Sequence, residues 1–180
     1  YYVCNAYGVC GIYSAPGTAV KEAYDTSGIV TNDRGVTVWL KGNRVSRNQI
    51  MAIKEESVTE QKNSLAVCLD NILRHAGITR NTEYDLAQGK TATTILSENM
   101  TGVQVLDLSG CTLDAVLYYV NQDIPVLAIL EDGEAVLVTG FNEFNVVIME
   151  PATGKLYKKG MNDATAWFAE NSNHFTTFMR

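Results

Sequence analysis

The feature that most constrains the fold of this chain is a run of four apolar segments near its C-terminus, joined by short turns. The segments span residues 124–130, 135–141, 145–151 and 155–159. Asp132 and Gly133 supply one turn, and Ala152, Thr153 and Gly154 supply another. Strands joined by turns this short pair with their chain neighbours in antiparallel fashion. The sequence therefore predicts an antiparallel meander over residues 124–159.

Helical patterns surround this meander. Residues 64–77 carry apolar side chains at helical spacing, with Asn63 or Ser64 as a suitable N-cap and Gly77 as a stop. Further helices are predicted after Asn81 and over residues 113–120 and 164–171, and further strands over 103–108 and 174–179. Helices packed on an antiparallel sheet define the α+β class, which is the predicted fold class.

Residues 1–57 form a separate, β-rich segment. We expect one or two short strands in residues 1–13, a short helix that ends at Gly28, and a hairpin over residues 28–40. The basic run 41–51 is a strand or a loop, and the polar run 54–63 is a linker. A unit of this size has a marginal core. We therefore expect it to pack on a larger domain formed by residues 58–180.

The charge distribution excludes some classes of partner. The net charge is −6, and residues 1–60 carry six Lys and Arg against six Asp and Glu, so the excess acid lies in residues 61–180. Nucleic acids and anionic membranes attract basic surfaces, so neither is expected as a partner. No apolar run approaches the roughly 18–20 residues that cross a bilayer. Because the chain starts at Tyr1 without a signal peptide, we expect a fragment of a longer protein.

The four cysteines do not suggest a metal site. No Cys-x-x-Cys pair and no His/Cys cluster with zinc spacing occurs, so no metal and no cofactor is expected. Cys4 and Cys10 lie six residues apart and can form a disulfide across a turn. Buried free thiols are the alternative, and the sequence leaves both open.

The predicted order of helices followed by a meander resembles that of a known family. The segments that show the resemblance are 125–130, 136–141 and 146–151. Over about residues 58–180 the chain resembles the papain-like cysteine peptidases that process bacteriocins by cutting double-glycine leader peptides, and their stand-alone bacterial relatives. The resemblance implies a papain-like fold. It also implies four positions: Ser64 for the nucleophile, Glu134 for the histidine, Glu150 for the aspartate and Gln61 near the oxyanion glutamine. Glu134 lies six residues before Gly140, and Glu150 lies sixteen after Glu134, as the family spacing requires.

The residue types at these positions are unsuited to the family's chemistry. A helix N-terminus favours a cysteine thiolate, but a serine there needs a strong general base. A glutamate is a weak base for this purpose, and a second carboxylate nearby repels it. The resemblance therefore implies an inactive peptidase-like domain in a larger bacterial surface or secreted protein. Its expected role is structural or the binding of a peptide or protein in the vestigial cleft.

Two active alternatives and one structural one remain. The chain could be a cysteine peptidase with relocated groups, Cys68 and His174, or a weak serine hydrolase that uses Ser64 and Glu134. It could also be a structural spacer. In the simplest interpretation Ser64 is only an N-cap, Glu134 a solvated turn residue and Cys68 a buried thiol. His75 cannot act as a base for Ser64, because eleven residues along one helix separate them by about 16 Å.

Overall fold

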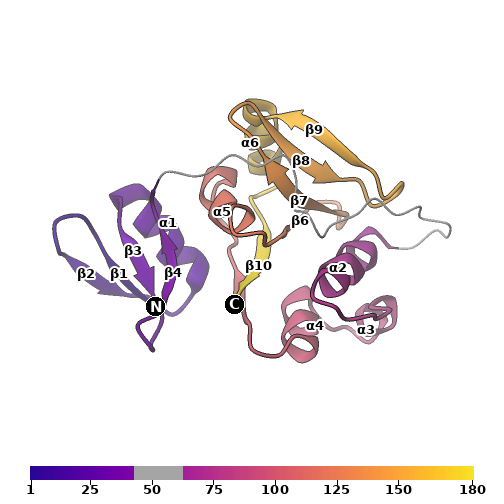
Figure 1. The fold of residues 1–180 in the computed structure, drawn as a ribbon, viewed down its shortest axis with the longest axis horizontal. Helices are drawn as coiled ribbons and strands as arrows, with labels where there is room; N and C mark the ends of the chain where they lie inside the picture. The colour runs from indigo at the N-terminus through magenta and orange to yellow at the C-terminus, as the bar shows by residue number, and fades with distance from the viewer. Residues whose placement is uncertain (43–62) are drawn as a thin grey trace.

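The fold is that of a computed structural model, which describes residues 1–42 and 63–180 (Figure 1). The predicted position Gln61, most of the run 41–51, nearly all of the linker and the boundary between residues 57 and 58 lie outside the described residues. The helices are α1 (Pro16–Thr26), α2 (Ser64–His75), α3 (Glu83–Ala87), α4 (Ala92–Asn99), α5 (Leu113–Val120) and α6 (Met161–Glu170). The strands are β1 (Tyr2–Cys4), β2 (Cys10–Ile12), β3 (Ile29–Thr31), β4 (Thr37–Leu40), β5 (Gln104–Asp107), β6 (Val126–Ile129), β7 (Ala135–Phe141), β8 (Asn145–Met149), β9 (Leu156–Gly160) and β10 (Phe175–Met179).

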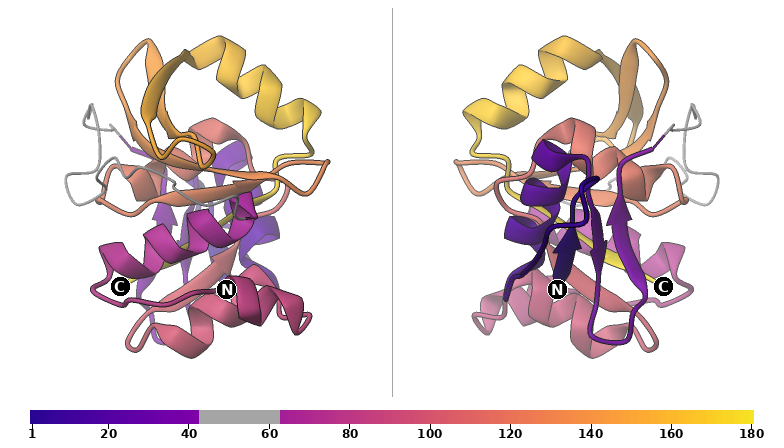
Figure 2. Two further views of the ribbon diagram at one scale, coloured as in Figure 1. Left: turned by 90° about the vertical axis from the view of Figure 1, so that its right-hand side faces the viewer. Right: turned by 90° about the vertical axis from the view of Figure 1, so that its left-hand side faces the viewer.

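The larger sheet contains the predicted meander. Its strand order is β5-β10-β6-β7-β8-β9, and every neighbouring pair is antiparallel. Strand β7 is buried along its whole length. Helix α2 packs on β6 and β7, and the other face is covered by α5 and α6, with Phe168 of α6 in ring contact with Phe175 of β10 (Figures 1 and 2). The predicted α+β class is confirmed.

Helix α2 begins at Ser64 because the preceding residue caps it. The side chain of Asn63 accepts a hydrogen bond from the backbone N–H of Leu65 at 2.9 Å. This bond satisfies one of the backbone donors that every helix start leaves without an intrahelical partner. Of the two predicted N-caps, Asn63 is therefore the one used. Ser64 is the first helical residue, and its hydroxyl is available for another contact.

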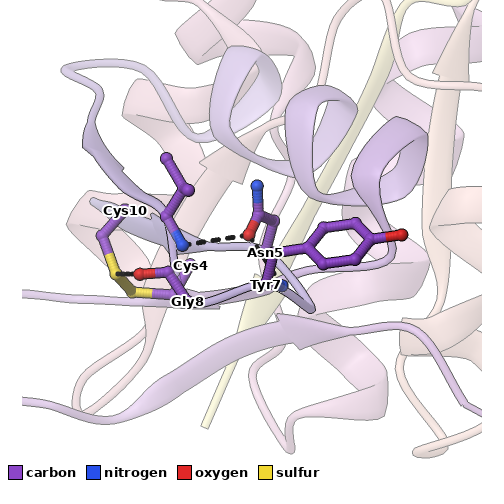
Figure 3. The surroundings of a disulfide bond; sticks show 6 residues. Cys4, Asn5, Tyr7, Gly8 and Cys10 are labelled. Atoms are coloured by element: carbon purple, nitrogen blue, oxygen red, sulfur yellow. Dashed lines mark hydrogen bonds between the residues drawn. A yellow bond between two sulfur atoms is a disulfide. The ribbon is translucent and has the colours of Figure 1, made fainter.

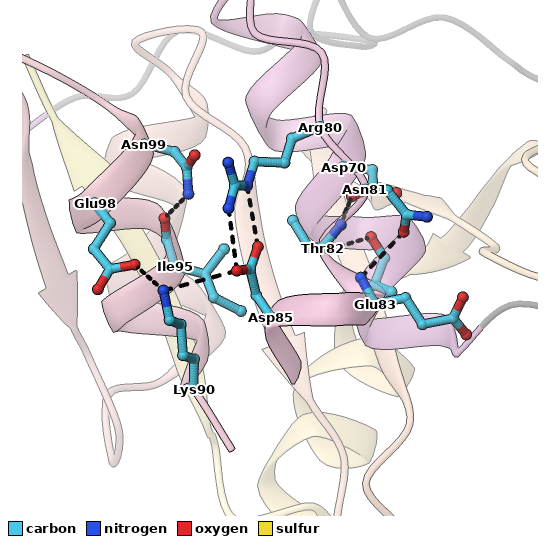
Figure 4. Close-up of polar contacts among 11 residues, drawn as sticks. Asp70, Arg80, Asn81, Thr82, Glu83, Asp85, Lys90, Ile95, Glu98 and Asn99 are labelled. Atoms are coloured by element: carbon cyan, nitrogen blue, oxygen red, sulfur yellow. Dashed lines mark hydrogen bonds and ion pairs between the residues drawn. The ribbon is translucent and has the colours of Figure 1, made fainter. Parts of the chain in front are cut away.

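A polar network fixes the corner between α2 and α4 (Figure 4). The buried carboxylate of Asp70 accepts hydrogen bonds from the backbone N–H and the hydroxyl of Thr82, at 2.9 and 2.8 Å. Arg80 donates two bonds to Asp85, at 3.0 and 3.1 Å, and Lys90 lies 3.7 Å from the same carboxylate. The hydrogen bond from Arg80 lowers the pKa of Asp85. These contacts position the short helix α3, whose one buried residue is Asp85.

The N-terminal segment forms a smaller sheet with strand order β2-β1-β3-β4, and α1 packs on one face of it. This segment is hydrogen-bonded to α5. The indole of Trp39 donates to the carbonyl of Ala115, and the hydroxyl of Tyr119 donates to the carbonyl of Val38, each at 2.9 Å. All four groups are buried or lie on buried residues, so the bonds form within one continuous core.

The first hairpin is closed by a disulfide between Cys4 and Cys10 (Figure 3). The two cysteines lie directly opposite each other on β1 and β2. The turn between them is held by Asn5, whose side chain accepts bonds from the backbone N–H groups of Tyr7 and Val9. Of the two alternatives left open for this pair, the structure has the disulfide.

Candidate functional site

The candidate site lies where the start of α2 meets the start of β7. The hydroxyl oxygen of Ser64 accepts a hydrogen bond from the backbone N–H of Ala135 at 2.9 Å. The pairing of Leu137 with Met149 places Pro151, beyond the end of β8, opposite Ala135. The N–H of Ala135 therefore has a side-chain acceptor at a point where the ladder with β8 has ended, while Ala135 still pairs with Ile129 of β6. Ser64 joins two elements that are 71 residues apart in the sequence.

The two glutamates of the candidate site lie in turns. Glu134 is exposed and directly precedes β7, and its N–H donates to the side chain of Asp132 at 2.9 Å. Glu150 is half-buried after β8, and its carboxylate accepts a bond from the N–H of Ala152 at 3.1 Å. The carboxylate of Glu150 thus stabilises the turn that follows β8.

Cys68 lies one helical turn after Ser64 and is completely buried. Burial, and then the nearby carboxylates of Glu150 and Glu134, raise the pKa of the Cys68 thiol far above its ordinary value. The bond between Ser64 and Ala135 places Glu134 close to the start of α2, and the register of β7 and β8 places Glu150 opposite Val136. The structure brings three of the predicted positions, Ser64, Glu134 and Glu150, to the first turns of this helix.

One neighbour of the site escaped the sequence analysis. Tyr157 of β9 is 37% exposed, and the burial of the rest of its ring together with the charge of Glu150 raises the pKa of its phenol. It belongs to the meander, where β8 and β9 pair Ile148 with Tyr157 two residues before Glu150. The sequence indicates that the segments 145–151 and 155–159 pair, but only the exact register of that pairing shows that Tyr157 lies near Glu150.

Neither histidine of the chain lies at the candidate site, and both belong to the described residues. His75 is at the end of α2, where its Nε2 donates to the carbonyl of Asp123 at 3.0 Å. His174 is exposed at the start of β10 and lines a pocket of about 410 Å³ with Ser109 and Glu131. Within the described part of the chain, no contact joins His174 to Cys68 or Ser64.

The described residues also offer no metal centre. Within residues 1–42 and 63–180, no three His, Cys, Asp or Glu side chains are grouped so that they could hold a metal ion. In the same ranges, no helix has the length and apolar character needed to cross a membrane. The side chains described at the candidate site carry hydroxyl, carboxylate and phenol groups, with the buried thiol of Cys68 one turn further along α2.

Helices on an antiparallel meander, with the start of α2 facing the first residues of β7, define a fold of the C39-like peptidase type. A crystal structure described as that of a candidate C39-like peptidase from Bacillus anthracis has this fold, with a TM-score of 0.61. The superposition covers 73% of this chain and 97% of that chain, at 12% sequence identity. No protein-family model and no curated protein sequence matches this chain. The likeness establishes the fold, and the activity has to be argued from the residues.

Proposed function

We propose that this chain is a peptidase-like domain without peptidase catalysis, which binds an extended peptide or a partner protein in a larger bacterial surface or secreted protein. The observation that carries the proposal is the hydrogen bond from the N–H of Ala135 to Ser64. The residue at the nucleophile position serves as an anchor between helix and strand. Both histidines of the chain lie away from it.

Hydrolysis by Ser64 would need a strong base within hydrogen-bond reach of its hydroxyl. The carboxylates nearby are weak bases for a serine, and the carboxylate of Glu150 is bonded to Ala152 in its own turn. Glu134 is exposed to solvent, which further weakens it as a catalytic partner. The serine-hydrolase alternative is therefore the less favoured one.

Hydrolysis by Cys68 and His174 is opposed by burial. A catalytic thiol is accessible and has a lowered pKa. Cys68 is buried and its thiol pKa is raised, while His174 is exposed in a different pocket. These two residues have the opposite properties from those that a thiolate–imidazole pair requires.

Two observations support the binding and localisation parts of the proposal. The larger sheet ends at the edge strands β5 and β9, and an extended peptide can add to such an edge through its backbone, so recognition does not depend on a catalytic group. The disulfide between Cys4 and Cys10 is of the kind that persists outside the reducing cytosol.

The experiment compares the natural chain with the variant Ser64→Cys/Glu134→His/Glu150→Asp. Both are treated with an electrophilic thiol-peptidase probe and with peptide substrates that contain a double-glycine site. We expect neither labelling nor cleavage for the natural chain. Labelling of Cys68 that is lost in a His174→Ala variant, or cleavage that is lost in Ser64→Ala, would overturn the proposal.

Binding is tested separately by selection from a displayed library of random 12-residue peptides on the immobilised chain. We expect enriched peptides whose binding is lost in the variant Glu134→Lys/Glu150→Lys and retained in Asp25→Lys, a charge change on the exposed side of α1. Failure to enrich any peptide, or binding that the double variant leaves intact, would favour the structural-spacer alternative.

A further inference from the structure

The small sheet β2-β1-β3-β4 has two faces of different character. Its inner face carries Val3, Val30 and Trp39, which are buried. The register places the alternate residues of the four strands together on the other side. We call this side the outer face, and it consists of Tyr2, Cys4, Cys10, Ile12, Ile29, Thr31, Thr37 and Leu40.

The outer face has the composition of a covered surface. An antiparallel sheet with one face toward water normally places polar side chains there. Here no outer-face residue is charged, and four large apolar side chains are exposed: Tyr2 by 44%, Ile12 by 78%, Ile29 by 48% and Leu40 by 39%. Single exposed apolar residues are ordinary, but a contiguous group on one face marks an interaction site.

The described part of this chain leaves the outer face uncovered. Helix α1 and the contacts with α5 lie on the inner side of the small sheet. Figure 1 shows this sheet at the end of the molecule opposite α2, and the right-hand view of Figure 2 looks toward that end. A partner on the outer face would therefore leave the start of α2 accessible.

We propose that the outer face binds a second copy of this chain, sheet against sheet. The charge distribution favours this partner. The net charge of −6 lies in residues 61–180, so most contacts between two copies are opposed by repulsion, whereas residues 1–60 are neutral. A two-fold axis brings the same patch of both copies together, and an uncharged apolar patch is complementary to itself. Two twisted sheets stack in this way about 10 Å apart.

The size of the outer face predicts the strength of the association. At roughly 200 Å² for a fully exposed large side chain, the exposed fractions of Tyr2, Ile12, Ile29 and Leu40 amount to on the order of 400 Å² of apolar surface per copy. From these four side chains two copies bury on the order of 800 Å² of apolar surface, which is the apolar share of an interface at the low end of the specific range. The dimer is therefore reversible and depends on concentration. This inference does not rest on the proposed peptide-binding function.

The test is sedimentation velocity of the whole chain over a concentration series from about 10 µM to about 1 mM, which covers the dissociation constants of weak, reversible dimers. The variants are Ile12→Lys and Ile29→Lys, and the control is Val9→Lys. Val9 belongs to the same hairpin and is 66% exposed, but the alternation of side chains places it off the outer face. Two-fold symmetry introduces each lysine twice, so both variants should raise the dissociation constant at least tenfold, while the control leaves it unchanged.

Salt gives an independent outcome. Because the contact is apolar and the copies carry like net charge, added salt should strengthen the association. A chain that stays monomeric up to about 1 mM overturns the proposal and assigns the face to a different protein. Dimerisation that salt abolishes, or that both lysine variants leave unchanged, also overturns it. Circular dichroism of each variant shows that a loss of association is not a loss of folding.

Discussion

At the residue scale, Ser64 determines how the candidate site is interpreted. Its hydroxyl oxygen accepts a hydrogen bond from the backbone N–H of Ala135. Because Ala135 is buried, water cannot reach this N–H, and Ser64 supplies the acceptor that it needs. The bond occupies one of the two lone pairs of the hydroxyl oxygen and draws electron density from it, which weakens the oxygen as a nucleophile. The hydroxyl of Ser64 fixes the first residue of β7 against α2.

Replacing this hydroxyl should destabilise the protein. In Ser64→Ala the N–H of Ala135 loses its acceptor, and a buried donor without a partner costs about 1–3 kcal/mol. Urea unfolding monitored by circular dichroism measures this cost. The control is Ser97→Ala on the exposed side of α4, which should change the free energy of unfolding by less than about 0.5 kcal/mol. Equal effects of the two substitutions would show that the bond with Ala135 contributes no stability.

The pKa of Asp85 leads to a prediction about acid stability. The hydrogen bond from Arg80 lowers this pKa in the folded protein below its unfolded value of 3.8. The stabilisation is therefore complete above pH 3.8 and is lost as the pH falls through the lower folded value. Asp85→Asn should lower the free energy of unfolding at pH 7 and reduce its fall between pH 5 and pH 2, about the range of such titrations.

The matched control for Asp85 is Asp25→Asn, an exposed residue of α1. Chemical unfolding at a series of pH values compares both variants with the natural chain. The interpretation of the network around α3 fails if Asp85→Asn shows the same pH dependence as the natural chain.

At the scale of the elements, the sequence was most informative where contacts are local. The meander could be predicted because its turns are too short for any other pairing. Helix α2 could be predicted because its apolar residues recur at helical spacing. The place of β10 between β5 and β6 did not follow, because it depends on pairing with strands tens of residues away. For the same reason the acceptor role of Ser64 was not predicted, since its partner is a backbone amide 71 residues away.

The disulfide of the first hairpin should stabilise the small sheet. It closes a short loop, and the chain-entropy relation gives about 2 kcal/mol for a loop of this length. The variant Cys4→Ala/Cys10→Ala should therefore unfold at lower denaturant concentration than the natural chain. Addition of a reductant should lower the midpoint of the natural chain toward that of the variant and leave the variant unchanged. A reductant-insensitive midpoint for the natural chain would contradict this prediction.

At the scale of the whole molecule, the N-terminal segment meets the larger part of the chain at a close backbone contact. A Cβ atom on Gly17 would lie 2.9 Å from the carbonyl oxygen of Ser109 and 3.2 Å from that of Asp107. Backbone atoms cannot move aside as a flexible side chain can. Gly17 is therefore the residue that lets α1 approach the end of β5.

Gly17→Ala should force these two parts of the molecule apart and cost about 1–3 kcal/mol. Thr18→Ala, the neighbouring exposed position of α1, should be close to neutral. Thermal unfolding of both variants measures the difference. If Gly17→Ala and Thr18→Ala have the same unfolding temperature, α1 does not pack as closely on the end of β5 as described.

The proposal that this peptidase-like fold does not cut peptides can be tested directly. The most direct test incubates the natural chain with a complex library of protein-derived peptides and counts new termini by mass spectrometry, with Ser64→Ala and Cys68→Ala as controls. We expect the same termini in all three samples and in a blank without protein. New termini that appear with the natural chain and disappear with either variant would contradict it.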